Sequence, residues 1–336
     1  MRSENQNFDL NQYIKGILSG DRATLSRAIT LRESTLSEHK LLSEKLLKSL
    51  IKHTGNSIRI GVTGIPGAGK STFIDIFGSY LIEKFNKKVA VLAVDPSSHE
   101  NQGSILGDKT RMEHLSRQDS AFIRPSPNKN ILGGVNQHTR ESMLFCEAAG
   151  YDIILIETVG VGQSEAKVHE MVDFLVMLQI VGGGDDLQAI KKGIYEKIDL
   201  ILIHKADQNN KIEAEVEKEK FFKNFALFPK RDSGWHPRAQ TCSSIEKTGI
   251  NEVWNTIAEF EKITRENDSF FKNRKSQNSV WFHHLVANNI RDFITNQSDL
   301  KIEIKNLQKQ IQNDEINSIV ASERITETLK KIFGQV

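Results

Sequence analysis

The stretch Gly64-Ile65-Pro66-Gly67-Ala68-Gly69-Lys70-Ser71 decides the fold of this chain of 336 residues. It follows a short apolar run, residues 58–63, and precedes a segment with apolar residues at helical spacing, residues 73–81. A glycine-rich turn between a buried strand and a helix lets backbone N–H groups close around phosphate oxygens. In such a turn, Lys70 reaches the β- and γ-phosphates and the Ser71 hydroxyl ligates Mg²⁺. The sequence therefore predicts a phosphate-binding loop.

The rest of the central region repeats this alternation of strand and helix. Short apolar runs predict buried strands at residues 58–63, 89–94, 153–156, 174–178 and 200–203. Strands of a parallel sheet have this continuous apolar character because helices cover both faces. Alternation with amphipathic helices is typical of βαβ units. We therefore predict an α/β fold, a P-loop nucleoside triphosphatase core with a mostly parallel sheet flanked by helices, and place it at residues 56–263.

Helical patterns flank the core on its N-terminal side. From residue 10 to about residue 52, apolar residues recur at helical spacing and no proline interrupts them. Gly20 and Asp21 have the character of a helix C-cap followed by an N-cap. We assign residues 1–55 to a helical N-terminal extension that contains a small helical hairpin.

The tail, residues 264–336, is also patterned as helix. Leu300, Ile304, Leu307 and Ile311 repeat at the spacing of a heptad seam. This seam indicates either a C-terminal dimerisation arm or a helix that packs on its own domain.

Composition and charge restrict the partners. Hydrophobic residues make up 38% and charged residues 26%, as in ordinary globular proteins. Lys and Arg number 45 against 43 for Asp and Glu, which supplies no basic field for nucleic acid or anionic membrane. No apolar run approaches the roughly 20 residues of a membrane-spanning helix, and the first residues lack a secretory or transit pattern. Cys146 and Cys242 form no C-x-x-C pair, so we expect a cytoplasmic protein.

Acidic residues end two of the predicted strands, Asp95 the second and Glu157 the third. Ligands of open α/β sheets bind beyond the carboxyl ends of the strands, so both acids are expected to face the nucleotide. Together with Asp108 they are candidates for holding Mg²⁺ and the attacking water. The candidate catalytic residues are Lys70, Glu157 and Asp108, and the candidate metal ligands are Ser71, Asp95, Asp108 and Glu157. A strand-end acid that caps a neighbouring helix is the alternative.

A base-reading signal follows the run at residues 200–203. His204-Lys205-Ala206-Asp207 resembles the N/T-K-x-D motif with which GTPases read guanine, although the first position has changed. The carboxylate of Asp207 accepts two hydrogen bonds from guanine while Lys205 lies along the base, and adenine offers no such pair of donors. His204 can replace one hydrogen bond of the usual asparagine but not both, so we expect a reduced affinity for the base. Ser243, Ser244 and Ile245 resemble the S-A-x loop behind the guanine.

Several longer strings resemble the MeaB/ArgK family of GTPases associated with methylmalonyl-CoA mutase. They are Gly64 to Thr72, Asp95-Pro96-Ser97-Ser98, Gly103 to Met112, Glu157 to Glu165, and residues 184–188 with 191–193. Departures from the family pattern are His204 and the string His99-Glu100-Asn101-Gln102.

The resemblance implies a homodimeric GTPase that hydrolyses GTP with Mg²⁺ and binds an adenosylcobalamin-dependent acyl-CoA mutase. Such a protein gates cofactor loading and protects or reactivates the mutase. Residues 103–112 and 157–165 would then be nucleotide-sensing switches, and residues 182–192 a third switch that reports to the mutase. No D-x-H-x-x-G string is present, so the corrin is expected to belong to the partner.

Three other functions compete with this one. An ATP-dependent kinase acting on a transport binding protein is opposed by Asp207 and the guanine-like loop. A metal-delivery GTPase commonly carries His- or Cys-rich tracts, whereas the ten histidines here are scattered and only His283 and His284 are adjacent. A scaffold that binds GTP without hydrolysing it is opposed by Lys70, Ser71 and Glu157.

Overall fold

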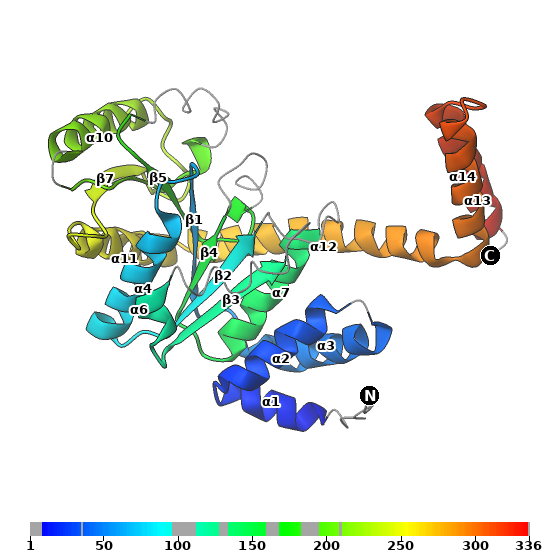
Figure 1. The fold of residues 1–336 in the computed structure, drawn as a ribbon, viewed down its shortest axis with the longest axis horizontal. Helices are drawn as coiled ribbons and strands as arrows, with labels where there is room; N and C mark the ends of the chain where they lie inside the picture. Colours follow the sequence, from blue (N-terminus) through cyan, green and yellow to red (C-terminus); the bar gives the residue numbers. More distant parts are fainter. Residues whose placement is uncertain are drawn as a thin grey trace. The chain divides into compact units, whose positions relative to one another are not determined.

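The computed structural model describes residues 9–34, 36–95, 112–127, 134–158, 168–182, 195–207 and 210–334 (Figure 1). The chain divides into two compact units, Met1–Arg274 and Lys275–Val336. The first unit contains the sheet, its covering helices and the N-terminal helices, and the second is helical.

One seven-stranded sheet organises the first unit, in the order β3-β2-β4-β1-β5-β6-β7. All neighbouring strands in this order pair in parallel. The strands are β1 (Ile58–Gly64), β2 (Val89–Asp95), β3 (Ala121–Pro127), β4 (Ile153–Glu157), β5 (Phe174–Gln179), β6 (Leu200–His204) and β7 (Arg238–Cys242). The central strand β1 lies between β4 and β5, so Ile60 pairs with Leu155 on one side and Phe174 on the other. The predicted α/β fold with a parallel sheet is confirmed.

Two strands, β3 and β7, do not follow from the apolar runs of the sequence. Both lie at the edges of the sheet, where a strand has a neighbour on one side only. β3 contains Arg124 and Pro125, and proline is tolerated at an edge because its missing N–H faces away from the ladder. β7 reads Arg-Ala-Gln-Thr-Cys, and its first four residues are only half-buried. Continuous apolar runs mark strands covered on both faces, so the edge strands lack this signal.

Helices cover both faces of the sheet and form two hydrophobic cores (Figure 1). One core contains apolar residues of α7 (Gly134–Ala148) and α10 (Lys211–Phe225), with the N-terminal helices packed against α7. The other contains apolar residues of α4 (Lys70–Phe85), α6 (Glu113–Ser116) and α11 (Ile250–Glu266). Two short 3-10 helices, η1 (Ile51–His53) and η2 (Tyr195–Lys197), precede β1 and β6.

The N-terminal extension has three helices: α1 (Leu10–Leu18), α2 (Arg22–Glu33) and α3 (Ser37–Leu50). The expected boundary at Gly20 and Asp21 is present, because Gly20 has φ of 78° and the Asp21 carboxylate caps α2 at the Thr24 N–H, at 2.8 Å. The expected hairpin therefore exists as α1 and α2, and α3 is added to it. Arg32 of α2 forms a buried ion pair with Glu141 of α7, which joins the extension to the core.

Three strands begin in the same way, with an aspartate directly before the first residue. Asp152 before β4 accepts the Lys88 N–H, Asp173 before β5 accepts the Arg59 N–H, and Asp199 before β6 accepts the Leu175 N–H, each at 2.8 Å. Each carboxylate thus binds the backbone at the start of a neighbouring strand. These bonds fix the alignment of three neighbouring pairs of strands at the amino-end edge of the sheet.

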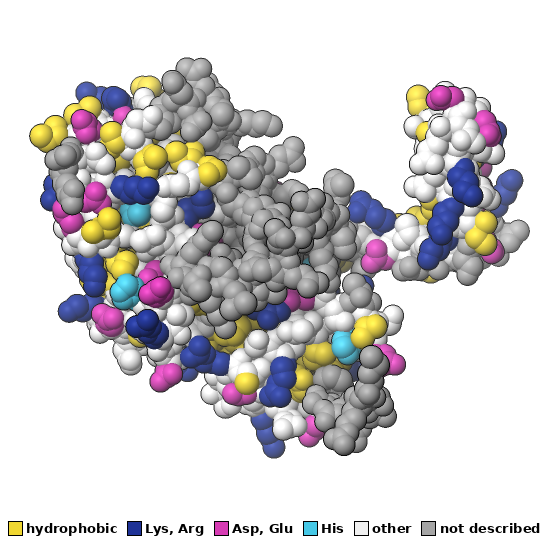
Figure 2. All heavy atoms as spheres, in the orientation of Figure 1, with side chains coloured by type: hydrophobic (Ala, Val, Ile, Leu, Met, Phe, Trp, Pro, Cys, Tyr) yellow, Lys and Arg dark blue, Asp and Glu magenta, His cyan; other side chains and the backbone are white. Residues whose placement is uncertain are grey.

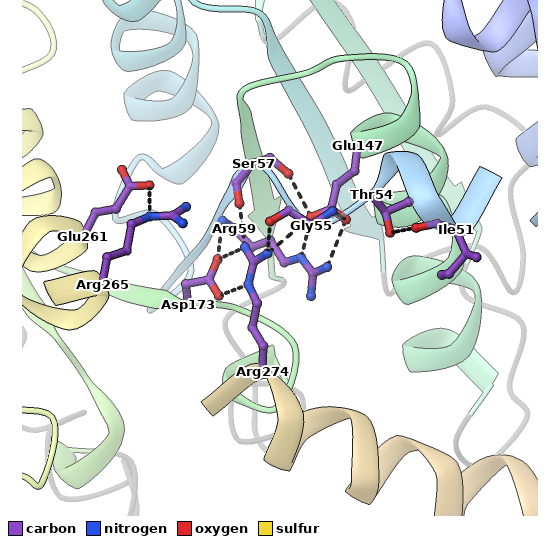
Figure 3. Close-up of polar contacts among 10 residues, drawn as sticks. All are labelled: Ile51, Thr54, Gly55, Ser57, Arg59, Glu147, Asp173, Glu261, Arg265 and Arg274. Carbon is purple, nitrogen blue, oxygen red and sulfur yellow. Dashed lines mark hydrogen bonds and ion pairs between the residues drawn. The ribbon is translucent and has the colours of Figure 1, made fainter. Parts of the chain in front are cut away.

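A buried charge cluster lies at the amino-end edge of the sheet (Figure 3). Its charged members, Arg59, Glu147, Asp173 and Arg274, are called the amino-end cluster below. Arg59 of β1 donates to Glu147 of α7 through Nε at 2.9 Å and Nη2 at 3.1 Å. Arg274 of α12 donates to Asp173 through Nε at 2.8 Å and Nη2 at 2.6 Å. Two bidentate pairs therefore join β1, α7, α12 and the start of β5.

The same cluster satisfies backbone groups of the segment that enters β1. Arg274 donates to the carbonyls of Gly55 at 2.7 Å and Ser57 at 2.5 Å. Glu147 accepts from the Gly55 N–H at 2.9 Å and the Ser57 hydroxyl at 2.8 Å. Burial alone would raise the pKa of Glu147, but the positive charge and hydrogen bonds of Arg59 hold that pKa below its usual value. Glu147 is thus a buried carboxylate that remains charged because it is paired.

The second unit consists of the remaining part of α12 (Ser269–Asn296), α13 (Ser298–Gln312) and α14 (Ser318–Phe333). Helices α13 and α14 pack against each other, and the Thr328 hydroxyl donates to Glu303 at 3.0 Å. Leu300 and Leu307 of the predicted heptad seam are buried within the chain itself. Packing on its own unit therefore accounts for part of the seam.

Charges of both signs are interspersed among the described side chains on the face drawn in Figure 2. This distribution agrees with the near balance of basic and acidic residues in the sequence. In the part of the chain that the structure describes, no helix has both the length and the apolar character needed to cross a membrane.

Candidate nucleotide-binding site

The phosphate-binding loop lies between β1 and α4, as the sequence predicts. It begins at Gly64, whose φ of 142° favours glycine and whose position leaves no room for a side chain. A Cβ there would lie 2.3 Å from the carbonyl oxygen of Leu178 in β5. Lys70 opens α4 and donates from Nζ to the carbonyls of Gly64 at 2.8 Å and Ile65 at 3.2 Å. The ammonium group is thus held over the loop by contacts that phosphate oxygens can replace.

The first predicted pair of metal ligands is in direct contact. The Ser71 hydroxyl donates to Oε1 of Glu157 at 2.7 Å, which brings the first turn of α4 to the end of β4. Next to Glu157, the Thr158 N–H donates to the Val62 carbonyl at 3.1 Å and its hydroxyl to Thr63 at 2.9 Å. These bonds fix the carboxylate of Glu157 at the carboxyl end of the sheet, beside the loop.

This pair of oxygens has the chemistry that Mg²⁺ requires. Mg²⁺ is held in nucleotide sites by one or two protein oxygens, with phosphates and waters completing its shell. Within the described ranges, no group of three or more His, Cys, Asp or Glu residues is arranged to hold a metal ion. Ser71 and Glu157 therefore fit an ion shared with phosphates rather than one enclosed by protein. Bound there, Mg²⁺ would neutralise charge on the β- and γ-phosphates.

His204 ends β6 and is almost fully buried, with 3% of its surface exposed. Its Nδ1 lies 2.6 Å from the Ala68 carbonyl oxygen and its Nε2 lies 2.7 Å from the Ser244 hydroxyl. Gly69, with φ of 88°, packs directly on the ring, and a Cβ there would lie 2.8 Å from Cε1. Burial lowers the pKa of His204, so the ring is neutral near pH 7. The changed first position of the N/T-K-x-D motif thus connects two loops of the site.

The other residues predicted to read the base come together at the ends of β6 and β7. The Ser243 hydroxyl donates to Oδ2 of Asp207 at 3.0 Å and accepts from the Glu246 N–H at 3.1 Å. The side chain of Lys205 is exposed, and its backbone has φ of 59°. Ile245 is 78% exposed at the tip of the loop. Asp207, half-buried, is therefore held in place by the loop that follows β7.

The structure thus gathers Gly64 to Thr72, Glu157, His204 to Asp207 and Ser243 to Ile245 at the carboxyl-end edge of one sheet. Asp95 ends β2 at this edge, and nothing is described of its side chain. Asp108 lies outside the described residues, as do residues 103–111, 159–165 and 183–192 of the expected switches. The roles assigned to all these residues stay predictions.

Sequence reasoning missed the internal partners of this site. Ala68 contributes through its carbonyl, and backbone groups carry no residue-type signal. The contact between Thr158 and Thr63 joins positions 95 residues apart in the sequence. Phe73 places its ring edge-on to His204, at 6.1 Å between ring centroids, from a helix position whose apolar spacing indicates only a core residue. The unusual histidine was the one available signal.

Comparison with known proteins decides the family. Residues 25–299 match the sequence profile of the family described as "Methylmalonyl Co-A mutase-associated GTPase MeaB". The chain belongs to this family. This MeaB-family protein is therefore a P-loop GTPase, and the resemblance noted in the sequence is confirmed.

Relatives of this MeaB-family GTPase extend over nearly the whole chain. "GTPase ArgK" of Escherichia coli is 47% identical over 83% of this chain and 87% of its own length. The mouse "Methylmalonic aciduria type A homolog, mitochondrial" is 38% identical over 98% of this chain and 81% of its own length. A crystal structure of an LAO/AO transport system kinase is 36% identical with a TM-score of 0.73, covering 96% of this chain and 97% of that chain.

Proposed function

We propose that this GTPase is a chaperone of an adenosylcobalamin-dependent acyl-CoA mutase of the methylmalonyl-CoA mutase type. It gates the loading of the cofactor and protects or reactivates the mutase. The observation that carries the proposal is the match to the mutase-associated family over residues 25–299, which include every residue of the candidate site. The mouse relative, whose name refers to methylmalonic aciduria, adds support. We place this function in the cytoplasm.

The site contains the groups that slow, regulated GTP hydrolysis needs. Lys70 and the loop N–H groups hold the phosphates, and Ser71 and Glu157 hold Mg²⁺. Asp207 and Lys205 select guanine, and Asp95 and Asp108 complete the predicted set of Mg²⁺ ligands. A low basal rate follows if the client must order residues 103–112 and 157–165 around the γ-phosphate.

We propose further that the active form is a homodimer that forms through the unit Lys275–Val336. Support comes from α12, where Phe282, Val286, Ile290 and Phe293 recur at helical spacing and each is at least 38% exposed. A second copy would bury this stripe. Sedimentation of the wild type and of the double variant F282S/I290S tests this: the wild type should sediment as a dimer and the variant as a monomer.

The test of the chaperone function is GTP turnover by the purified protein with and without a purified adenosylcobalamin-dependent acyl-CoA mutase from the same source. Parallel reactions contain ATP, and a mutase that does not use adenosylcobalamin serves as the control protein. We expect GTP turnover that rises with the cognate mutase only. GTP turnover that does not change when the mutase is added would assign the GTPase to another client, such as a metalloenzyme that lacks its metal.

One alternative has a specific observation behind it. The similar solved structure is described as an LAO/AO transport system kinase, which suggests phosphoryl transfer from ATP to a transport binding protein. The carboxylate of Asp207 opposes it because adenine lacks the paired donors that the carboxylate accepts. Preferential turnover of ATP in the parallel reactions would favour the kinase.

A further inference from the structure

A groove, called the β3 groove below, lies along the free edge of the first strand in the sheet order. Helix α2 belongs to the hydrophobic core on one face of the sheet and α6 to the core on the other face. The groove has a volume of about 260 Å³ and is lined by residues 121–123 of β3, Ser116 of α6, and Arg22, Ala23 and Ser26 of α2. None of these residues belongs to the candidate nucleotide site.

The backbone of β3 is paired on one side only. The Val89 N–H of β2 donates to the Ser120 carbonyl at 2.9 Å, and Val89 is in register with Ala121. In a parallel ladder alternate residues bond to the same neighbour, so the even-numbered residues of β3 face β2. The odd-numbered residues Ala121 and Ile123 therefore direct their backbone groups toward the open edge of the sheet.

The open edge offers one hydrogen-bond donor between two acceptors. The Ala121 N–H donates to the Gln118 carbonyl at 3.1 Å, but the Ala121 carbonyl and both backbone groups of Ile123 have no partner among the described residues. Pro125, the next odd-numbered residue, has no N–H and ends the run of usable groups. This pattern of acceptor, donor and acceptor is complementary to the backbone of one short extended segment.

Size and charge define what the β3 groove can hold. Its volume is below the roughly 300 to 1,000 Å³ of small-molecule sites, so it fits a short stretch of chain better than a cofactor. Arg22 has a side chain that is 45% exposed, and its guanidinium makes only long contacts, 3.5 Å to the Gln118 carbonyl and 4.0 Å to the fully exposed Asp119. An acidic side chain of an incoming segment can replace these contacts with a bidentate pair.

The depth of the groove decides against a second copy of this chain as the occupant. β3 is recessed between two helices, with Ala121 2% and Ile123 9% exposed. The same edge of another copy is recessed to the same extent, so the two backbones cannot approach to the separation of about 4.8 Å that strand pairing needs. A segment that enters the groove must therefore be extended and free of flanking helices.

We propose that the β3 groove binds an extended segment of the mutase by strand addition, with backbone hydrogen bonds to Ile123 and an acidic side chain of the segment paired with Arg22. This inference rests on the proposed chaperone function. It assigns a contact with the mutase to the edge of the sheet, separate from the residues that bind the nucleotide.

Two substitutions close the groove in different ways. R22E reverses the charge at its side, and a glutamate suits the first turn of a helix, so α2 should remain intact. A23W fills the space with an indole ring from an exposed helix position. R27E is the matched control, because Arg27 is an exposed arginine of the same helix that does not line the groove.

The experiment measures the affinity of the whole chain for the purified mutase by calorimetry, with GDP and with a non-hydrolysable GTP analogue in parallel. We expect R22E and A23W each to weaken binding by about 10-fold or more, and R27E to change it by less than about 2-fold. Hydrogen exchange of the wild type, followed by mass spectrometry, should slow in residues 121–124 when the mutase binds, because the Ile123 N–H becomes paired.

A complex of equal affinity in the wild type, R22E and A23W would overturn the groove as a docking site and leave the chaperone function in place. Unchanged hydrogen exchange in residues 121–124 would overturn strand addition even if R22E weakened binding. The absence of any complex in the wild type would contradict both proposals. Circular dichroism and GTP turnover without the mutase should be the same in all variants, and if A23W fails to fold, R22E and the exchange measurement still decide.

Discussion

The two ends of the same sheet use similar polar groups in different ways. At the amino end, Arg274 and Glu147 bind fixed partners of the protein itself, and both are buried (Figure 3). At the carboxyl end, Lys70 donates to two loop carbonyls and Ser71 to Glu157. Phosphates and Mg²⁺ can replace the carboxyl-end contacts of Lys70 and Ser71. Nothing from solvent can replace the buried contacts at the amino end. The exchangeability of the partners therefore separates a ligand site from a structural cluster.

The largest effect should come from breaking the amino-end cluster. E147A leaves Arg59 without its carboxylate in a buried place, and we expect a loss of about 3 to 5 kcal/mol in the free energy of unfolding. Urea denaturation followed by circular dichroism measures it. The control is E259A, which breaks an exposed pair with Arg238 and should cost less than about 1 kcal/mol. Similar losses in both variants would show that the cluster is not a special support of the fold.

A substitution at the carboxyl end of the sheet should lower GTP turnover and leave the free energy of unfolding nearly unchanged. K70A removes the charge that the phosphates need, and we expect GTP turnover to fall by about 100- to 1000-fold. The unfolding free energy without nucleotide should change by less than about 1 kcal/mol, because Lys70 is only partly buried and its ammonium group donates to two loop carbonyls. K84A changes an exposed lysine near the other end of the same helix and is the control for turnover. A large loss of stability in K70A would contradict the contrast between the two ends.

A substitution of Asp207, the residue predicted to read the base, should have a smaller effect, on the preference for GTP over ATP. D207N exchanges a carboxylate that accepts two hydrogen bonds for an amide that accepts and donates, and we expect the preference for GTP over ATP to fall about 10- to 100-fold. Xanthosine triphosphate carries an oxygen in place of the amino group of guanine, so the amide should bind it better than the carboxylate does. Competition binding measures all three nucleotides. Unchanged selection of GTP over ATP would remove Asp207 from the base-reading role.

The smallest predicted effect is the pH dependence of stability that His169 contributes. Burial first, and then the positive charges of Lys197 and Arg231, lower the pKa of His169 to about 4 from its ordinary value of 6.5. Between these values the unfolded chain binds a proton that the folded chain does not, so stability falls as the pH decreases below about 6.5. For His169 this amounts to about 1.4 kcal/mol between pH 8 and pH 5.5.

Denaturation of the wild type and of H169Q at both pH values isolates this contribution. The variant should lose less stability on acidification than the wild type, and the remaining slope belongs to other titrating groups. An identical pH dependence of the two proteins would mean that the folded state does not resist protonation at this position.

The sequence predicts the centre of the fold better than its edges. The five apolar runs are strands because helices cover both of their faces, and the loop from Gly64 to Ser71 lies where its glycines and lysine indicate. The edge strands β3 and β7 are not predicted from the sequence, because β7 contains polar residues and β3 contains polar residues and proline. The long-range ion pairs escape as well: Arg274 and Asp173 are 101 residues apart, and no periodicity relates them.

The candidate site shows the same division between residue type and partner. Glu157 is placed by its position at a strand end, and the structure adds its contact with Ser71. His204 attracts notice because it departs from a motif, but its partners are a backbone carbonyl and a serine from another loop. The identity of a residue states which bonds it can make, and only the folded chain determines which bonds it makes.

The aspartates that open β4, β5 and β6 also carry a consequence for errors of assembly. Each binds an N–H of a neighbouring strand, and Asp173 and Asp199 are buried. If one strand slid along another by a single residue, a buried carboxylate would lose its donor at a cost of about 1 to 3 kcal/mol or more. Parallel sheets form slowly because their contacts join distant segments, so mispaired intermediates have time to appear. The three aspartates make such intermediates unfavourable, which acts as a proofreading device that an assay of GTP turnover alone would not reveal.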